Sequence, residues 1–292
     1  MNDEQHFLER LQRIVVYRRG ETRAPHKPLY LLQCIAGIQH GHPRLRPFAI
    51  IEPLLKEALI RFGLKTNSVS PQYPFWRLQN DGLAEVNPSG PYKIRKQSDD
   101  PTKSSLLEMN AHGGLIERDF QLLTGNLDLQ TLAIHRILDG HFPKSIHEDL
   151  TEFFNLRFYG VREGDQNTDS EFRVRVLEAY ENTCALSGFS LRYRNTFPGL
   201  EAAHICWPQA GGNDDVCNGI AMTTLHRKLF HLGLFTIDET MKVIVCSDLA
   251  ETNKCSFALA GIANQGLRVP RDQQFYPNPN ALKWHRKWVF RG

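Results

Sequence analysis

Apolar positions at helical spacing dominate the first half of the chain. In 48–62 they recur three, four and seven positions apart, and 29–39 is an almost wholly apolar run. A short apolar stretch at 83–86 predicts a strand. Five segments are predicted to be helices: 7–17, 29–39, 48–62, 127–138 and 146–154. The pattern therefore predicts a mainly helical first domain.

The second half reads differently, as short apolar segments separated by turns. A strand is predicted at 200–206 because the apolar run stops at Trp207-Pro208. A helix follows at 225–232, where Thr223 or Thr224 can cap its start and Gly233 its end. A helix beginning near Phe172 opens this half, and 234–237 with 243–246 predict a hairpin.

A polar, acidic stretch separates the two halves. Residues 160–170 contain few apolar side chains and are predicted to be a linker. The predicted organisation is a first domain at 1–159, this linker, and a second domain at 171–292. The fold class is α+β, with a mainly helical domain followed by a ββα domain.

Composition limits the protein class. The 292 residues carry a net charge of +3, and no apolar run approaches the roughly 18 residues of a membrane span. The six cysteines are scattered without a Cys-x-x-Cys pair, which argues against a zinc ribbon. Free thiols and a polar N-terminus predict a cytoplasmic protein. Basic segments at 10–27 and 268–291 indicate nucleic acid only in combination with other features.

Candidate chemistry lies in 200–235, which holds His204, Asn218 and His226. Hydrolysis of a phosphodiester needs a base for water and a cation at the developing charge. Neutral histidine is a common base near pH 7, and an asparagine amide can orient it by a hydrogen bond. A histidine on the facing helix can bind the metal. Either histidine alone is more often a packed core residue.

The order of these three residues, with the phrases EAAHI, NGIAM and GLFTID around them, resembles the HNH nuclease domain of McrA-type restriction enzymes. The resemblance covers about 170–248. It implies a ββα-metal fold in which His204 is the general base, Asn218 orients it and His226 is a metal ligand.

This sequence departs from that family's pattern at the metal. Ala203 stands where many HNH sites carry a further ligand just before the base. Glu201 and His231 are the candidates for the missing ligand. The helix also runs one residue longer than usual between His226 and the position of His231.

Two phrases stand out in the first domain, RAPHKPL at 23–29 and QYPFWRL at 72–78. The first places cations and donors at a helix N-terminus, which attracts anions. The second is aromatic and restricted by an X-Pro bond. Residue chemistry alone supports two interpretations equally. The phrases form either a phosphate-binding site beside an apolar pocket, or a proline-rich turn beside a cluster of core aromatic side chains.

These phrases resemble the sulfur-binding domain of phosphorothioate-dependent type IV restriction enzymes, over about 7–83. The resemblance implies that Tyr73 and Pro74 form the apolar wall of a sulfur cavity. It implies that His26 and Lys27, with Arg23 nearby, hold the rim and the DNA backbone. Arg77 falls where the family often has a small residue, which leaves its role open. An apolar notch is easier to fill with weakly hydrated sulfur than with a hydrated oxygen.

The sequence thus predicts a modification-dependent endonuclease that recognises phosphorothioated double-stranded DNA and cuts near the mark. It uses a divalent metal, Mg²⁺ or Mn²⁺, and a homodimer would cut both strands. Two main alternatives remain at this point, besides a metal-dependent nuclease that acts on RNA. One is an HNH enzyme that reads another mark such as methylcytosine, and the other is a DNA-binding protein with a decayed nuclease site.

Overall fold

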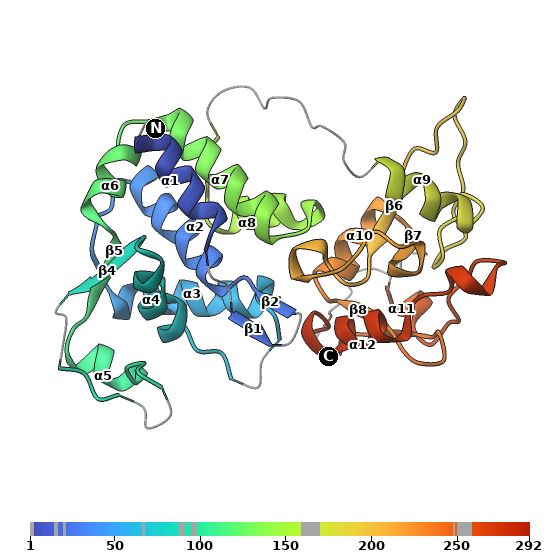
Figure 1. Cartoon of the computed structure of the whole chain (residues 1–292). Coiled ribbons are helices and arrows are strands. Elements are labelled where there is room, and N and C mark those ends of the chain that lie inside the picture. Colours follow the sequence, from blue (N-terminus) through green and yellow to red (C-terminus); the bar gives the residue numbers. More distant parts are fainter. Residues whose placement is uncertain are drawn as a thin grey trace. The chain divides into compact units, whose positions relative to one another are not determined.

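The chain folds into two compact units, Met1–Arg162 and Glu163–Gly292 (Figure 1). The computed structural model describes residues 3–14, 17–19, 22–65, 68–87, 91–94, 98–158, 170–247, 249 and 259–292. The predicted linker at 160–170 lies outside the described residues except for the backbone of Ser170, so the exact domain boundaries stay a prediction.

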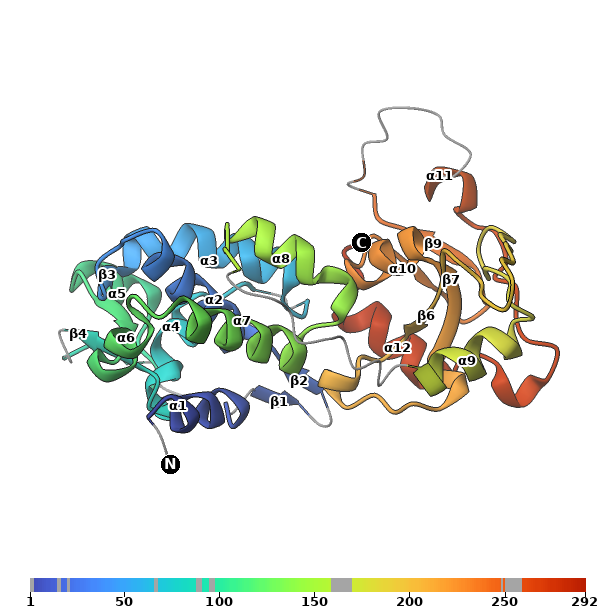
Figure 2. The same cartoon turned by 90° about the horizontal axis from the view of Figure 1, so that it is seen from above.

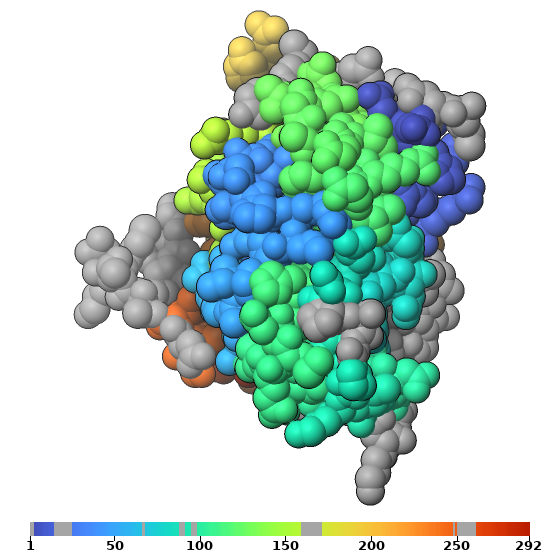
Figure 3. Space-filling view, turned by 90° about the vertical axis from the view of Figure 1, so that its left-hand side faces the viewer, coloured from blue at the N-terminus to red at the C-terminus, as the bar shows by residue number. Residues whose placement is uncertain are grey.

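The first unit is built around the apolar helix α2, His26–Gln39. It packs against α3, α4, α6 and α7, and α1 packs against α7 (Figure 2). The helices of this unit are α1 (Asp3–Gln12), α2, α3 (Phe48–Phe62), α4 (Gln72–Arg77), α5 (Lys103–Glu108), α6 (Glu117–Leu123), α7 (Leu127–His141) and α8 (His147–Phe153). Segments far apart in the sequence, coloured blue, teal and green, share one face of this unit (Figure 3).

Short strands complete the first unit. An antiparallel sheet has the order β3 (Arg46–Pro47), β5 (His112–Leu115), β4 (Ala84–Asn87), with Ala84 opposite Leu115. A separate hairpin pairs β1 (Tyr17–Arg19) with β2 (Thr22–Ala24). The predicted strand at 83–86 is confirmed within one residue, whereas β3 and β5 carry too little apolar pattern to be predicted.

The predicted helices of this unit exist, and most of them differ from the prediction at one or both ends. The helix at 48–62 is confirmed at both ends, and 29–39 begins earlier, at His26. The helix predicted at 7–17 occupies Asp3–Gln12, because acidic side chains in its first turn favour a helix N-terminus there. The phrase at 72–78 also forms a helix, α4, which the two prolines in this region concealed.

The second unit is a hairpin with helices packed on it. Strand β6 (Leu200–His204) pairs antiparallel with β7 (Gly219–Thr223), and α10 (Thr224–His231) follows directly, so the predicted ββα order is confirmed. Helix α9 (Ser170–Ala179) also packs on both strands. The other strands and α-helices in the described part of this unit are β8 (Phe235–Ile237), β9 (Val243–Val245), α11 (Leu259–Ile262) and α12 (Pro279–Trp288).

Sequence pattern explains where this hairpin and helix end. Thr223 caps α10 by accepting a hydrogen bond from the His226 amide (3.2 Å), and Gly233 follows its end with a positive φ of 78°. Both features were predicted from sequence. Within the described residues, no helix is both long and apolar enough to traverse a bilayer.

Candidate functional site

His204 ends strand β6, opposite Gly219 on β7. Its ring is nearly buried and stacks on the ring of Phe172 from α9, with centroids 3.8 Å apart and planes 10° apart. Its Nε2 lies 2.8 Å from Oδ1 of Asp214, whose side chain is 65% exposed. The stack and the carboxylate together fix the orientation of the imidazole at the surface of the unit.

Gly219 makes the Phe172 stack possible. A Cβ at this position would lie 2.4 Å from Cγ2 of Val176 and 2.9 Å from the Phe172 ring. Helix α9 therefore approaches the end of the hairpin closely because residue 219 has no side chain.

Asn218 braces the loop before β7 rather than the His204 ring. Its Oδ1 accepts a hydrogen bond from the Cys206 amide (2.9 Å). Its Nδ2 donates to the carbonyl groups of Cys206 (3.0 Å) and Asn213 (2.7 Å). The expected hydrogen bond from Asn218 to the His204 ring is thus replaced by three bonds to backbone. Its amide is nearly buried and joins the two ends of the loop that carries Asp214.

His226 lies at the other end of the strand pair. Its Nδ1 is 2.9 Å from Oγ1 of Thr223, which pairs with Leu200, and 3.5 Å from Sγ of Cys184. The His204 and Leu200 ends of the ladder are four residues apart, about 13 Å at the usual strand rise. The structure therefore does not bring the two imidazoles together as predicted, because their neighbours lie at opposite ends of the hairpin.

The two further candidate ligands have other partners. The Glu201 carboxylate pairs with Arg227 (3.3 Å) and Arg173 (3.6 Å). The Nε2 of His231 donates to the carbonyl of His204 (3.1 Å), and burial lowers the pKa of His231 well below its usual value. Both side chains are thus engaged by groups other than a metal.

The fit of these donors to a divalent metal is therefore incomplete. The Nε2 of His226 is buried and has no hydrogen-bond partner among the described residues, which suits a metal ligand. However, no three His, Cys, Asp or Glu side chains converge on one point within the part of the chain that the structure describes. The metal site expected from sequence is not completed by these residues.

Sequence reasoning missed three neighbours of these histidines. Asp214 lies in the GGNDD loop, which was interpreted as a turn, although a carboxylate between His204 and Asn218 was a signal for an imidazole partner. Phe172 is predicted only as the start of a helix, and Cys184 carries no predicted role. Burial raises its pKa, but hydrogen bonds from His226 and Ser187 outweigh this and lower the pKa of Cys184 to about 7.

The predicted recognition residues lie on two neighbouring helices. His26 and Lys27 are in the first turn of α2, and Tyr73, Pro74 and Arg77 are in α4. The guanidinium of Arg77 packs over the Tyr73 ring, 4.5 Å from its centroid. Burial lowers the pKa of His26 to about 4, the Leu64 backbone opposes this, and the nearby charge of Arg77 adds to the lowering. His26 is therefore neutral at pH 7 and lies near Arg77. Pro74 is buried and Tyr73 half-buried in α4.

Two cations among the predicted recognition residues have acidic partners. Lys27 Nζ lies 2.6 Å from Oδ2 of Asp81, and both side chains are largely buried. Arg77 pairs with Asp100 through two bonds, from Nε (2.8 Å) and from Nη2 (2.5 Å). The structure thus places Lys27 and Arg77 in ion pairs that the sequence did not reveal. The side chain of Arg23 lies outside the described part of the chain.

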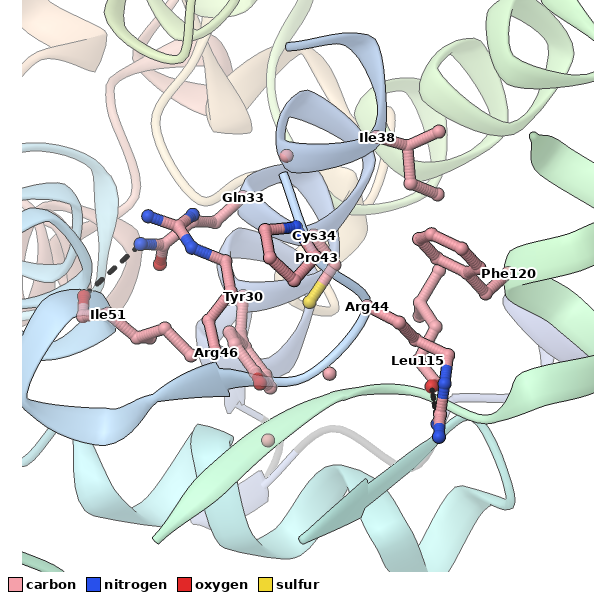
Figure 4. A pocket seen from close by; sticks show the side chains of 13 residues that line it. Tyr30, Gln33, Cys34, Ile38, Pro43, Arg44, Arg46, Ile51, Leu115 and Phe120 are labelled. Atoms are coloured by element: carbon pink, nitrogen blue, oxygen red, sulfur yellow. Dashed lines mark hydrogen bonds between the residues drawn. The ribbon is translucent and has the colours of Figure 1, made fainter. Parts of the chain in front are cut away.

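A small cavity in the first unit is separate from these residues. It lies between α2 and β5 and leaves about 20 Å³, which is room for one water molecule (Figure 4). Gln33 on its wall donates to the carbonyl of Ile51 (3.1 Å), while its buried Oε1 has no hydrogen-bond partner. Burial raises the pKa of Cys34, also on the wall, to about 12, although the Tyr30 hydroxyl and the Arg46 charge lower it. The cavity is too small for a nucleotide.

Comparison with known proteins identifies both halves of the chain. A family model described as the ScoMcrA-like DNA sulfur-binding domain matches residues 4–159. The chain belongs to this family. A second model, HNH endonuclease, matches residues 184–238. The predicted family, the α+β fold class and the combination of a sulfur-binding domain with an HNH endonuclease domain are therefore confirmed. No curated protein is significantly similar to the chain.

Several solved structures resemble parts of the chain. The sulfur-binding domain of ScoMcrA complexed with phosphorothioated DNA is 25% identical, with 51% of this chain and 98% of that chain covered and a TM-score of 0.45. The corresponding domain of SprMcrA, also complexed with phosphorothioated DNA, is 21% identical, with coverage of 53% and 95% and a TM-score of 0.43. The type IV phosphorothioation-dependent restriction endonuclease ScoMcrA is 23% identical, with coverage of 53% and 35% and a TM-score of 0.42.

Proposed function

We propose that this protein is a restriction endonuclease that recognises phosphorothioated DNA with its first unit and hydrolyses phosphodiester bonds near the mark with its second. The match of both domain models within one chain carries the proposal. We further propose that the enzyme acts as a homodimer on double-stranded DNA in the cytoplasm, because cutting both strands needs two active sites.

In this proposal His204 is the general base. Asp214 accepts the hydrogen bond from Nε2, which keeps a proton on that atom and places the imidazole lone pair on Nδ1. A lone pair so oriented takes a proton from water as it attacks the phosphorus. Phe172 holds the ring plane, and Asn218 keeps the Asp214 loop in place through its backbone bonds.

HNH domains generally use a divalent metal, and we propose Mg²⁺ or Mn²⁺ for this one. Of the predicted ligands, His226 fits best because its Nε2 is buried without a partner. Glu201 and His231 are weaker candidates because of their ion pairs and hydrogen bond. No step of the reaction is assigned to the metal from this arrangement.

The test is a cleavage panel with the full-length protein. Phosphorothioated, 5-methylcytosine and plain duplexes of one sequence are incubated with Mg²⁺ or Mn²⁺, with and without EDTA. Cutting confined to the phosphorothioated duplex and abolished by EDTA is expected. Equal cutting of the plain duplex would refute recognition of sulfur, and selective cutting of the methylated duplex would favour another mark.

The incomplete donor set in the described residues favours a second candidate, a DNA-binding protein with an inactive nuclease unit. His204→Ala separates the two. In the proposed enzyme it abolishes nicking while binding to phosphorothioated DNA is retained. If the wild-type protein binds that DNA and never cuts it with either metal, the second candidate is correct.

A further inference from the structure

The recognition residues of the first unit form an internally neutralised site. His26 is uncharged at neutral pH, Lys27 is paired with Asp81, and Arg77 is paired with Asp100. The Asp81 and Asp100 side chains are only 5% and 8% exposed, so both acids belong to the site rather than to the surrounding surface. Among its described residues, each cation of this site has its own carboxylate.

The Arg77 pair also fixes the direction of hydrogen-bond donors. Two of its N–H groups, at Nε and Nη2, are aimed at Asp100, and the guanidinium plane covers the Tyr73 ring. A two-bond arginine–carboxylate pair holds this geometry far better than a single bond would. The guanidinium therefore adds a flat surface beside Tyr73, with two of its donors turned toward Asp100.

This direction matters because the two linkages that the site must distinguish carry the same charge. A phosphorothioate differs from a phosphate in one non-bridging atom, and sulfur is the larger, less hydrated atom and the weaker hydrogen-bond acceptor. A donor aimed at that atom stabilises oxygen more than sulfur. An apolar or flat wall lacks that preference, and desolvating sulfur against it costs less than desolvating oxygen.

We propose that Asp100 is a specificity-determining residue of sulfur recognition. It acts by holding Arg77 so that these two donors, at Nε and Nη2, do not turn to the DNA linkage, and Asp81 acts on Lys27 in the same way. The proposal rests on the proposed function, because it assumes that this site reads phosphorothioated DNA. Asp100 and Asp81 are thus positioning residues that lower the affinity for plain DNA.

The test compares the binding of two duplexes by the full-length protein. Both duplexes carry the same randomised positions on either side of one central linkage. This linkage is a phosphorothioate in one duplex and a phosphate in the other. EDTA is present to prevent cleavage. In Asp100→Asn, Arg77 gains freedom to donate to oxygen. A charge-assisted hydrogen bond corresponds to about a tenfold gain in affinity for the plain duplex. The affinity for the modified duplex should change less than about threefold, so the preference for sulfur falls.

A matched control and a double variant make the result specific. Glu117→Gln removes the same charge from the same unit, where Glu117 pairs with Arg44, which is not one of the recognition residues. It should leave the preference unchanged. The double variant Arg77→Gln/Asp100→Asn lacks the guanidinium that Asp100→Asn sets free. Its affinity for the plain duplex should therefore fall back to the wild-type level.

Three outcomes would overturn the proposal. These are an unchanged preference in Asp100→Asn, a loss of binding to both duplexes at an unchanged melting temperature, and a gain for plain DNA that persists in the double variant. If Asp100→Asn does not fold, Asp81→Asn takes its place with the same criteria. A wild-type protein that binds both duplexes equally would instead refute the proposed function.

Discussion

The Asp214→Asn variant tests the assignment of His204 most directly. The carboxylate accepts a hydrogen bond from Nε2 of His204 at 2.8 Å, and an amide in its place keeps the shape but removes the charge. A hydrogen bond to a charged group contributes about 1.5–3 kcal/mol. Because the Asp214 side chain is 65% exposed, water screens the interaction and the lower end applies. About 1.4 kcal/mol corresponds to a tenfold loss of kcat.

The assay is single-turnover cleavage of a phosphorothioated duplex, with kcat and KM measured separately. The expected loss lies in kcat, because Asp214 orients the base and does not bind the DNA in this assignment. Asp215→Asn is the matched control. It removes the same charge from the neighbouring position, where the Asp215 carboxylate accepts a hydrogen bond from the Asn213 side chain, and it should keep kcat within about threefold.

Two results would refute this reasoning. If a higher metal concentration restores the activity of Asp214→Asn, the carboxylate binds the cation and does not position the imidazole. If Asp214→Asn keeps kcat within about threefold of the wild-type value, the hydrogen bond from His204 to Asp214 does not contribute to the action of the base.

Three more predictions concern the surroundings of the base. Asn218→Ala should lower the free energy of unfolding by about 2–3 kcal/mol and reduce cleavage, because its three hydrogen bonds to the loop backbone are lost. Chemical denaturation measures the first effect, and cleavage kinetics measure the second. Gly219→Ala should lower the free energy of unfolding by about 1–3 kcal/mol and reduce kcat, because the alanine Cβ would displace Phe172 from the His204 ring. An unchanged near-UV circular dichroism spectrum together with an unchanged kcat would contradict this. Burial lowers the pKa of His285 to about 3, so the unfolded chain binds a proton below about pH 6.5 that the folded chain does not, and stability is lost as the pH falls. Between pH 7 and pH 5 this histidine should account for about 2 kcal/mol of lost stability, and urea unfolding of His285→Gln at both values should show a loss smaller by that amount.

The order of elements at the nuclease site could be predicted because it is local. A short apolar strand stopped by a proline, a turn-rich loop and a capped helix are each determined by neighbouring residues. The same holds for α3, whose periodic apolar face fixed both of its ends. The order of His204, Asn218 and His226, together with the phrases around them, predicts the HNH domain that the family model confirms.

The contacts of those residues could not be predicted, because they depend on register. The ladder places His204 opposite Gly219 and Thr223 opposite Leu200, which carries His226 to the far end of the hairpin. A spacing in the sequence does not state which end of a ladder each residue reaches. Likewise, the partners of Lys27 and Arg77 are acids 54 and 23 residues further along the chain, and neither belongs to the phrases that drew attention.

The buried histidines of the second unit show why His226 remains the best candidate for a ligand. His285 is equally buried, but both of its ring nitrogens are bonded, Nδ1 near the Thr236 hydroxyl (2.9 Å) and Nε2 to the Phe230 carbonyl (3.0 Å). Its burial is that of a packed core residue. His226 leaves Nε2 buried without a partner, and such an atom costs about 1–3 kcal/mol of stability. Packing alone gives no reason to keep that cost, because an apolar side chain would fill the same space. Among the described residues, this unpaired nitrogen is the observation that supports the proposal that His226 binds the metal.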